Sequence, residues 1–284
     1  MQIFNKGAFL DHLSHEPMIM GVVNVTPDSF SDGGQFYNAD KAIEHGLRLL
    51  QEGVHILDVG GESTRPGADI VDIDEEIQRV VPVVKALREA GAQWVSIDTR
   101  NAATMRSALE VGANIINDIS ALSYDPESLE VVAAAKVPVI LMHSQGTPQD
   151  MQDNPNYNNV VEDVFDYLKS RIEACKAHRI ETDLLIVDPG IGFGKTVEHN
   201  MLLLRNIKIF QDLGVSVLLG TSRKSFIAKL SNNEPADERL AGSLSSALWG
   251  LSQGVKIFRV HDVKETRQAF RIYDAISSAD AIGV

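Results

Sequence analysis

The sequence is poor in cysteine and lacks long apolar stretches. Cys175 is the only cysteine, which excludes a disulfide within the chain and a cysteine-based metal cluster. No run approaches the roughly 18 apolar residues of a membrane-spanning helix, so we predict no such helix. The first 17 residues carry acids and histidines where a signal peptide needs an apolar stretch. We therefore expect a cytoplasmic protein.

Basic residues are also scarce. The chain has 26 Lys and Arg residues against 39 Asp and Glu residues, a formal net charge of −13. This acidity argues against nucleic acid and against an anionic membrane surface as partners. It is still compatible with a small anionic ligand, because a local cationic pocket does not show in a net charge. With 44% hydrophobic and 23% charged residues, the composition is that of a globular protein.

Short apolar runs alternate with longer amphipathic segments along the whole chain. Successive apolar residues within each run are typical of strands buried on both faces of a parallel sheet. The predicted strands are residues 18–25, 56–59, 94–97, 115–117, 137–142, 184–187, 215–219 and 256–260. Their steady alternation with helical patterns favours a single (β/α)8 TIM barrel over a doubly wound open sheet. We expect residues 1–17 to be an N-terminal extension and residues 18–284 to form the barrel domain.

Two of the amphipathic segments carry further detail. Asp72, with Glu75 three residues later, resembles a capping box at the start of a helix. Ile73 and the apolar residues behind it are predicted to form the buried face of that helix. Cys175 lies on the apolar face of another predicted helix, which is typical of a core thiol rather than a nucleophile.

Hydrogen-bonding or charged residues follow every predicted strand, where a barrel carries its active site. Helix capping explains an Asp, Asn or Ser at a single strand end, but not all eight ends together. Asp98, Asn117 and Asp188 follow three central strands. Two carboxylates and an amide can accept from and donate to a flat, nitrogen-rich heterocycle.

A second group of strand-end residues is cationic. Its natural ligands are phosphate and carboxylate groups, and its members are Arg65, Arg223, Lys224, Arg259 and His261. Arg259 and His261 are two residues apart, so their side chains point the same way from one strand. Backbone N–H groups at Ser222, where a helix begins, also suit an anion. Asn24 offers a neutral oxygen suited to Mg²⁺ that is held mainly by water and phosphate.

Several other motifs fail on inspection. The stretch 190–195 resembles a phosphate loop, but Pro189 stands where a Walker A motif needs glycine, and Lys195 where a dinucleotide motif does. No zinc-binding spacing occurs among the eight histidines. Lys224 also fits the Schiff-base lysine of an aldolase, an alternative disfavoured by the anion and heterocycle residues around it. We find no Ser–His or Cys–His pair in the pattern and expect no protein nucleophile.

Four motifs together resemble the bacterial dihydropteroate synthase family. They are N-V-T-P-D-S-F-S-D-G-G at 24–34, G-G-E-S-T-R-P-G at 60–67, D-P-G-I-G-F-G-K at 188–195 and S-R-K at 222–224, and R-V-H-D at 259–262 also fits. The resemblance implies a TIM barrel that joins a dihydropterin-methyl diphosphate to p-aminobenzoate. The reaction releases diphosphate in the presence of Mg²⁺ and makes dihydropteroate for folate synthesis. The family also implies a homodimer formed through outer helices.

The resemblance implies a role for each matching residue. Asn24 would contact the metal. Asp98, Asn117, Asp188 and Lys224 would hold the pterin, with Met142 and Gly220 in the pocket wall. Thr64, Arg65, Arg259 and His261 would face the diphosphate, and Phe30, Pro66, Phe193 and Ser225 would line the p-aminobenzoate side. The residues implied in catalysis are Asp98, Lys224, Arg259, His261 and Arg65.

The implied chemistry agrees with the residue types. Cations and Mg²⁺ stabilise a departing diphosphate, and buried carboxylates stabilise the positive pterin-methyl centre that it leaves. We therefore favour a dissociative substitution, with loops 26–37 and 61–70 closing over the diphosphate. A methyltetrahydrofolate–corrinoid methyltransferase would share the pterin residues but would not use Arg65, Arg259 and His261. A non-catalytic pterin-binding barrel would bind the pterin and release no diphosphate.

Overall fold

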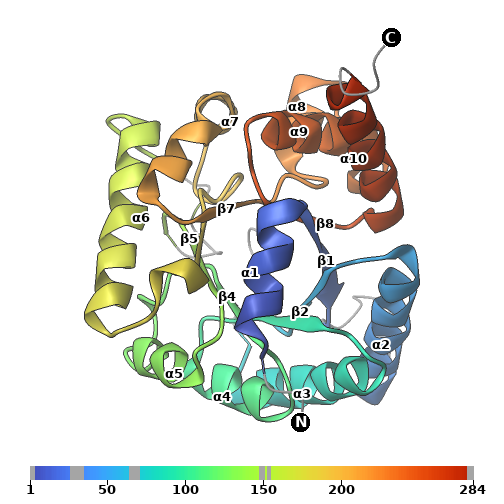
Figure 1. Ribbon diagram of the computed structural model, residues 1–284, viewed down its shortest axis with the longest axis vertical. Helices are drawn as coiled ribbons and strands as arrows, with labels where there is room; N and C mark the ends of the chain where they lie inside the picture. The colour runs from blue at the N-terminus through green and yellow to red at the C-terminus, as the bar shows by residue number, and fades with distance from the viewer. Residues whose placement is uncertain (1–3, 26–34, 64–70, 147–150, 152–154, 280–284) are drawn as a thin grey trace.

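Eight parallel strands close into a barrel in the order of the sequence (Figure 1). This computed structural model describes residues 4–25, 35–63, 71–146, 151 and 155–279. The strands are β1 Met18–Asn24, β2 Ile56–Gly60, β3 Trp94–Asp98, β4 Ile115–Asp118, β5 Val139–Met142, β6 Leu185–Asp188, β7 Ser216–Leu219 and β8 Ile257–Val260. Each predicted strand is present, and pairing of β8 with β1 completes the circle. The TIM-barrel prediction is confirmed.

Helices surround the strands and fill the connections between them. The outer helices are α2 Gln35–Glu52, α3 Ile73–Glu89, α4 Ala102–Glu110, α5 Ser128–Ala135, α6 Val160–Ala177, α7 Val197–Arg205, α8 Ser225–Leu230, α9 Leu240–Ser252 and α10 Val263–Ser277. Short 3₁₀ helices are η1 Thr182–Leu184, η2 Ile207–Leu213 and η3 Ala236–Glu238. Within the described residues, none of the helices combines the length and the apolar character needed to span a bilayer.

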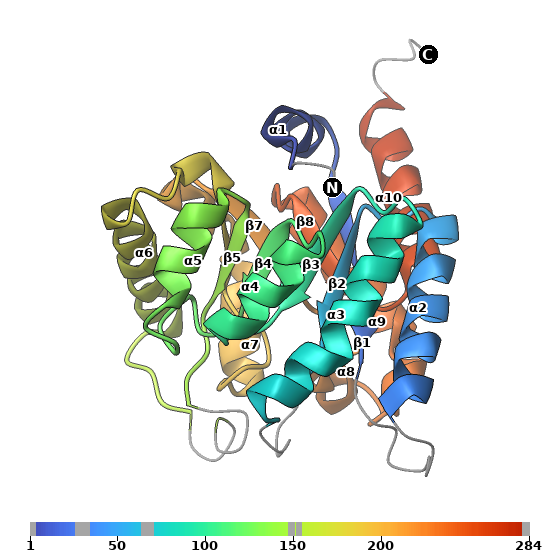
Figure 2. The same ribbon diagram turned by 90° about the horizontal axis from the view of Figure 1, so that it is seen from below.

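The first helix, α1 Lys6–His15, has a different position. It lies across one end of the barrel instead of beside the strands (Figure 2). Phe9 and Leu13 of α1 pack into a buried cluster with residues from the barrel interior, including Trp94 and Ile257. This end carries the amino termini of the strands, so α1 fills it with apolar side chains. The residues that follow the strands lie at the opposite end, which is called the mouth below.

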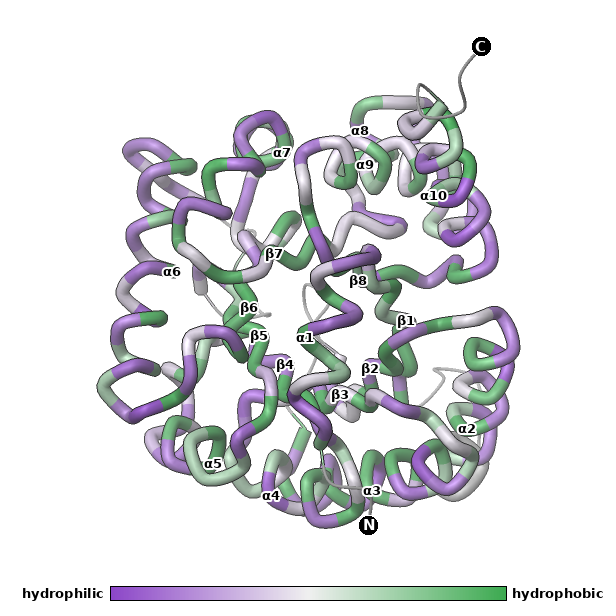
Figure 3. Tube along the Cα trace, viewed as in Figure 1, coloured by the Kyte–Doolittle hydropathy of each residue, from purple (hydrophilic) through white to green (hydrophobic). Residues whose placement is uncertain are grey.

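The remaining core lies between the strands and the outer helices. It is a second buried cluster that draws apolar residues from the strands and from the inner faces of the helices. Figure 3 shows the corresponding pattern, with hydrophobic strands and helices that alternate between hydrophilic and hydrophobic turns. Cys175 is fully buried on α6 as predicted, and burial raises the pKa of its thiol to about 11. A buried thiol with a raised pKa is a core group and not a nucleophile.

The start of α3 differs from the sequence prediction. Asp72 caps the helix by accepting a hydrogen bond from the Asp74 amide. Glu75 does not complete a capping box, because its carboxylate pairs with Arg79 one turn further on. Ile73 was expected on the buried face but is 41% exposed. The helix turns Glu76 inward instead, and a polar contact described below explains that choice.

Candidate active site

Three of the predicted site residues lie at the mouth, two of them on adjacent strands. Asp98 ends β3 and pairs in register with Asn117 of β4, while Asp188 ends β6 and pairs with Met142 of β5. All of these side chains are buried. Parallel strands present their carboxyl ends at the same level, so the polar groups collect in one layer. The prediction that Asp98, Asn117 and Asp188 share the mouth is confirmed.

The other predicted residues divide into described and undescribed positions. Around the same mouth the structure places Asn24 at the end of β1, Phe193 after β6, Gly220, Lys224 and Ser225 after β7, and Arg259 and His261 at β8. Phe30, Thr64, Arg65 and Pro66 lie outside the described residues, as do most of the two loops expected to close.

Asp58 is a site residue that the sequence interpretation missed. It lies fully buried within β2 and accepts a hydrogen bond of 2.7 Å from Arg259 Nε. Asn117 Nδ2 donates to the same carboxylate at 3.2 Å. The available signal was an aspartate inside the apolar run I-L-D-V-G, because a buried carboxylate without a partner is strongly unfavourable.

Arg259 connects the carboxylates of two strands. Besides Asp58, it donates from Nη2 to Asp98 Oδ2 at 2.8 Å. The resemblance assigned Arg259 to the diphosphate and Asp98 to the pterin. In this structure the two residues are in direct contact. The Arg259 side chain is partly exposed and lies near Asp58, Asp98 and Asp188. Desolvation lowers the pKa of Arg259, but these carboxylates outweigh that effect and raise it.

Burial perturbs the ionisation of the carboxylates and of the lysine in the mouth. It raises the pKa of Asp98 to about 7, with the Asp58 charge adding to the effect and Arg259 opposing it. Burial also raises the pKa of Asp188, against the Gly190 N–H donor and the Lys224 charge. The pKa of Lys224 falls to about 8 by burial and by the nearby Arg259. Strongly perturbed groups of opposite charge in one cleft are typical of a functional site.

His261 and Ser222 form a close pair on the anion side of the mouth. Ser222 Oγ accepts from the His261 backbone N–H and lies 3.1 Å from His261 Nδ1. This corrects the expectation that the chain has no Ser–His pair. Burial, Arg259 and Arg223 lower the pKa of His261 to about 4, and the adjacent Asp262 pairs with Arg223 and not with the imidazole. The pair therefore lacks the orienting carboxylate of a catalytic triad.

Arg223, which the sequence predicted in the anion-binding group, forms an ion pair with Asp262. Its guanidinium makes a two-point contact with Asp262, including a 3.1 Å bond from Nε to Oδ2. The Arg223 carbonyl oxygen accepts a hydrogen bond of 3.0 Å from Arg239. The bidentate pair occupies two of the five guanidinium N–H donors and offsets the charge of Arg223. Arg223 therefore links the loop after β7 to the end of β8.

Two cationic contacts shape the side of the mouth near β6. Lys224 Nζ lies 4.0 Å from the centre of the Phe193 ring, a cation–π distance. Lys195 is only 3% exposed, and its ammonium donates to Phe193 O at 2.9 Å. The sequence interpretation considered Lys195 in a failed phosphate-loop motif and as the last residue of the family motif at 188–195, and assigned it no role. The structure adds that Lys195 is buried in the protein interior, which the motif alone did not indicate.

Buried polar groups also support the base of the loop after β2. Glu76 of α3 accepts from Asn101 Nδ2 at 2.8 Å and from Thr104 Oγ1 at 2.6 Å. These bonds explain why α3 buries Glu76 and leaves Ile73 exposed. Arg100 pairs with Glu62 of the loop at 3.3 Å, and both side chains are almost fully buried. The residues that lead into the undescribed loop segment are thus held in place on one side.

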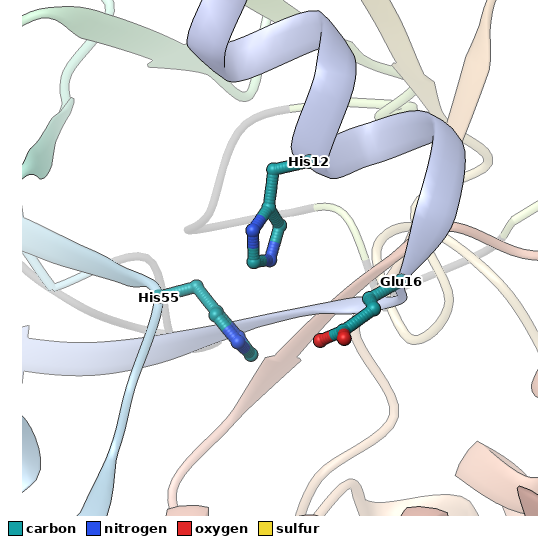
Figure 4. A group of neighbouring side chains, drawn as sticks. All are labelled: His12, Glu16 and His55. Carbon is teal, nitrogen blue, oxygen red and sulfur yellow. The ribbon is translucent and has the colours of Figure 1, made fainter.

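A separate group of possible metal ligands lies at the other end of the barrel. Among the described residues, His12, Glu16 and His55 are the one such group of three (Figure 4). His55 Nδ1 accepts a 2.8 Å hydrogen bond from the Ile19 backbone N–H. The neutral ring must then carry its proton on Nε2 and presents a donor, not a metal ligand. We interpret the group as a contact between α1 and the barrel.

Comparison with known proteins agrees with the fold and with the mouth. The sequence profile described as "Pterin binding enzyme" matches residues 20–261. This span includes every strand except the first two residues of β1. The chain therefore belongs to the pterin-binding enzyme family.

The relatives define the branch of that family. The chain is 47% identical to the dihydropteroate synthase of Escherichia coli K12 over 279 residues, 98% of each chain. It is also 47% identical to that of Haemophilus influenzae over 263 residues, 93% of this chain and 95% of the relative. These values place the chain among the dihydropteroate synthases, and the resemblance drawn from the motifs is confirmed.

Solved structures give the same result. A dihydropteroate synthase of Xanthomonas albilineans with 4-aminobenzoic acid has a TM-score of 0.87 and 44% identity, covering 93% of this chain and 94% of that one. A Yersinia pestis dihydropteroate synthase in a sulfonamide complex also has a TM-score of 0.87 and 44% identity, with 94% and 96% coverage.

Proposed function

We propose that this chain condenses 6-hydroxymethyl-7,8-dihydropterin diphosphate with p-aminobenzoate to give 7,8-dihydropteroate and diphosphate. The observation that carries this proposal is the layer of buried acceptors at the mouth, Asp98, Asn117 and Asp188, in contact with cations. The acceptors suit the N–H groups of a pterin ring. The neighbouring cations suit the diphosphate that the ring carries.

The pterin would occupy the layer formed by Asp98, Asn117 and Asp188. Lys224 would donate to an acceptor on the ring, while Met142 would pack against a ring face. Gly220 adds the space for a flat ligand, because a Cβ at this position would lie 3.8 Å from Arg259 Cβ and 3.9 Å from Asp188 Oδ2. A larger side chain would project toward the same two groups. We therefore assign Gly220 to the pocket wall.

The diphosphate would bind beside Arg259 and His261. The His261 pKa of about 4 leaves the imidazole neutral at physiological pH, and a bound anion would raise that pKa by stabilising the imidazolium. Ser222 holds the ring in position through its 3.1 Å contact with Nδ1. Thr64 and Arg65 complete this region in the proposal, on the strength of the family motif.

Mg²⁺ is the cofactor that the family implies, and Asn24 fits it. The Asn24 side chain is exposed at the mouth end of β1, and an amide oxygen is a ligand that Mg²⁺ accepts. A single protein oxygen suits an ion that retains water and phosphate ligands. When bound there, Mg²⁺ would neutralise charge on the departing diphosphate.

The bond between the pterin methylene carbon and the diphosphate oxygen would break first or during attack. Asp98 and Asp188 would stabilise the positive charge that develops on the pterin, because a preorganised carboxylate does so without reorganisation. The p-aminobenzoate nitrogen would then form the new C–N bond and lose a proton. Phe193 and Ser225 border this side of the mouth, and Phe30 and Pro66 complete it by family motif.

The decisive experiment measures diphosphate release from the pterin substrate with Mg²⁺, with and without p-aminobenzoate. We expect release to be coupled to dihydropteroate formation. Asp98→Asn should lower that rate on the order of 100-fold, because it removes a charge from the reacting centre. Asp74→Asn on the exposed surface of α3 is the matched control. Pterin binding without release in the wild type would instead indicate a non-catalytic pterin-binding barrel.

The identity to dihydropteroate synthases disfavours the other enzyme considered, a methyltetrahydrofolate–corrinoid methyltransferase. It has no diphosphate to bind and gives no role to the Arg259–His261 pair. The cytoplasmic location and the single barrel domain over residues 18–284 stay predictions.

We also propose that the chain forms a homodimer through α9 and α10. These helices border a surface groove of about 500 Å³ lined mainly by apolar side chains, among them Leu244, Leu248, Ile272 and Ile276. Ile272 is 58% exposed and Ile276 is 70% exposed. An apolar surface of this kind is typical of an interface between protein chains.

A further inference from the structure

A buried ion pair lies beside the mouth and has no part in the proposed reaction. Arg100 Nη2 lies 3.3 Å from Glu62 Oε1, and the two side chains are only 7% and 9% exposed. Arg100 follows the end of β3, and Glu62 follows the end of β2. Since replacing a buried ion pair by apolar residues often leaves stability unchanged, stability alone does not account for this one.

Glu62 also joins the two ends of the connection between β2 and α3. The oxygen that accepts from Arg100 accepts a second hydrogen bond, of 3.2 Å, from the Val71 backbone N–H. Glu62 lies at the start of this connection, and Val71 lies at its end, directly before Asp72 caps α3. Bringing the ends of a chain segment together reduces the number of conformations that the residues between them can adopt.

The start of the connection is fixed by α3 as well. Arg79 Nη1 donates a hydrogen bond of 2.8 Å to the Gly61 carbonyl oxygen. Gly61 packs so closely on this helix that a Cβ at its position would lie 2.8 Å from Val80 Cγ1. The backbone at Gly61 therefore has little room to move, and the Glu62 side chain extends from a defined position.

Arg100 is itself held by two neighbouring strand ends. Its guanidinium carbon lies 4.2 Å from the centre of the Tyr124 ring, a distance at which an aromatic ring attracts a cation. Tyr124 belongs to the loop after β4 and covers the guanidinium with one face of its ring. Thr99, the residue before Arg100, donates its backbone N–H to Asn117 O at 3.0 Å. Arg100 therefore has a fixed position relative to the pterin layer of the mouth.

We propose that Arg100 is a positioning residue for the binding of the diphosphate end of the substrate. Through Glu62 it ties the connection between β2 and α3 to β3, the strand that carries the proposed pterin ligand Asp98. That connection contains Thr64 and Arg65, which the family motif assigns to the diphosphate. The inference rests on the proposed function, because it takes Arg65 as a diphosphate ligand.

The test compares Arg100→Met, Glu62→Met and the double variant with the wild type. Each single change leaves one buried charge without its partner and should lower the melting temperature, whereas the double change removes both charges. All three variants lose the contact between Arg100 and the connection. We therefore expect the melting temperature to recover in the double variant. In contrast, kcat/KM for the pterin diphosphate should stay about tenfold below the wild type in all three, because the diphosphate ligands are misplaced.

A second measurement separates the diphosphate end of the substrate from the pterin end. The dissociation constant of 6-hydroxymethylpterin, which carries no diphosphate, should stay at the wild-type value in all three variants. General disorder of the mouth would weaken the binding of this ligand as well. Arg106→Met is the matched control, because it breaks the exposed ion pair between Arg106 of α4 and Glu127. It should keep the wild-type kcat/KM.

Two results would overturn the inference. One is recovery of kcat/KM together with the melting temperature in the double variant, and the other is weaker binding of 6-hydroxymethylpterin in the variants. If the single variants do not fold, the double variant carries the same test, because it contains neither unpaired charge. If the wild type releases no diphosphate, the proposed function fails. Normal wild-type release with unaffected variants would reject only the role of Arg100.

Discussion

Several charged and polar side chains at the barrel mouth contact one another, and Asp58 accepts hydrogen bonds from two of them, Arg259 and Asn117. It holds the Arg259 guanidinium from below and orients the Asn117 amide, while Asp98 binds the other arm of Arg259. Each of these groups would be unfavourable if buried alone. The proposed substrate-binding residues are thus supported by a fully buried carboxylate.

We predict that Asp58→Asn lowers both turnover and the pKa of Asp98. Loss of the Asp58 charge removes a repulsion that raises the Asp98 pKa and leaves Arg259 to act mainly on Asp98. The acid limb of kcat/KM should therefore move to lower pH. Turnover should fall about tenfold or more, because Arg259 loses one of its two anchors. A pH–rate profile measures both effects.

The surface variant Asp74→Asn, without a contact to the mouth, serves as its control. An unchanged acid limb in Asp58→Asn would show that the two carboxylates are not coupled through Arg259.

The sequence predicted the polar residues at the strand ends but not Asp58. The ends of the strands could be located because continuous apolar runs mark a parallel sheet, and polar residues then stand out. Asp58 was missed because it lies inside such a run. Its partner Arg259 is 201 residues away along the chain, and spacing gives no access to a contact of that kind. For a related reason, the sequence does not show that Asp262 pairs with Arg223.

At the scale of single elements, α1 is the part of the structure least expected from the sequence. Residues 1–17 were predicted only as an extension, whereas α1 packs Phe9 and Leu13 into the barrel. His55 contributes to the same end by binding the Ile19 amide. His12 packs on His55 with ring centres 4.8 Å apart, and its Nε2 is buried without a partner among the described residues.

This arrangement predicts that His55 contributes to a loss of stability at acidic pH, as do the other buried histidines with a strongly lowered pKa, His143 and His261. Burial lowers the pKa of His55 to about 4, below the value of about 6.5 expected in the unfolded chain. Between these two pH values the unfolded chain is protonated at His55 and the native state is not. The free energy of unfolding therefore decreases as the pH falls from about 6.5 toward 4. Thermal denaturation should therefore show a melting temperature that decreases over this pH range.

His55→Asn provides the comparison. Asn places an acceptor oxygen near the position of Nδ1 but does not ionise. Between pH 7 and 5, the melting temperature of His55→Asn should decrease about 2 °C less than that of the wild type. Exposed His15→Asn on α1 should keep the wild-type dependence, and an equal decrease in His55→Asn and wild type would exclude His55 as the cause.

For the whole molecule, the apolar groove on α9 and α10 predicts the oligomeric state. We expect a dimer in sedimentation experiments and a monomer for Ile272→Glu, because a buried unpaired carboxylate opposes association. Ile73→Glu introduces the same change at an exposed position of α3 and should remain dimeric. A monomeric wild type, or a dimeric Ile272→Glu variant, would assign the groove another role.

Because one end of the barrel is filled, ligands can enter and leave only at the other end. Because α1 and its apolar partners occupy the amino-terminal end, every molecule that reaches Asp188 enters and leaves through the mouth. A pterin bound at the level of Asp98 and Asp188 lies beneath whatever binds later. Dihydropteroate must then withdraw its pterin end through the mouth before the next pterin diphosphate enters. Product and pterin substrate therefore exclude each other, and the emptying of the pocket becomes a step that can limit the rate of the cycle.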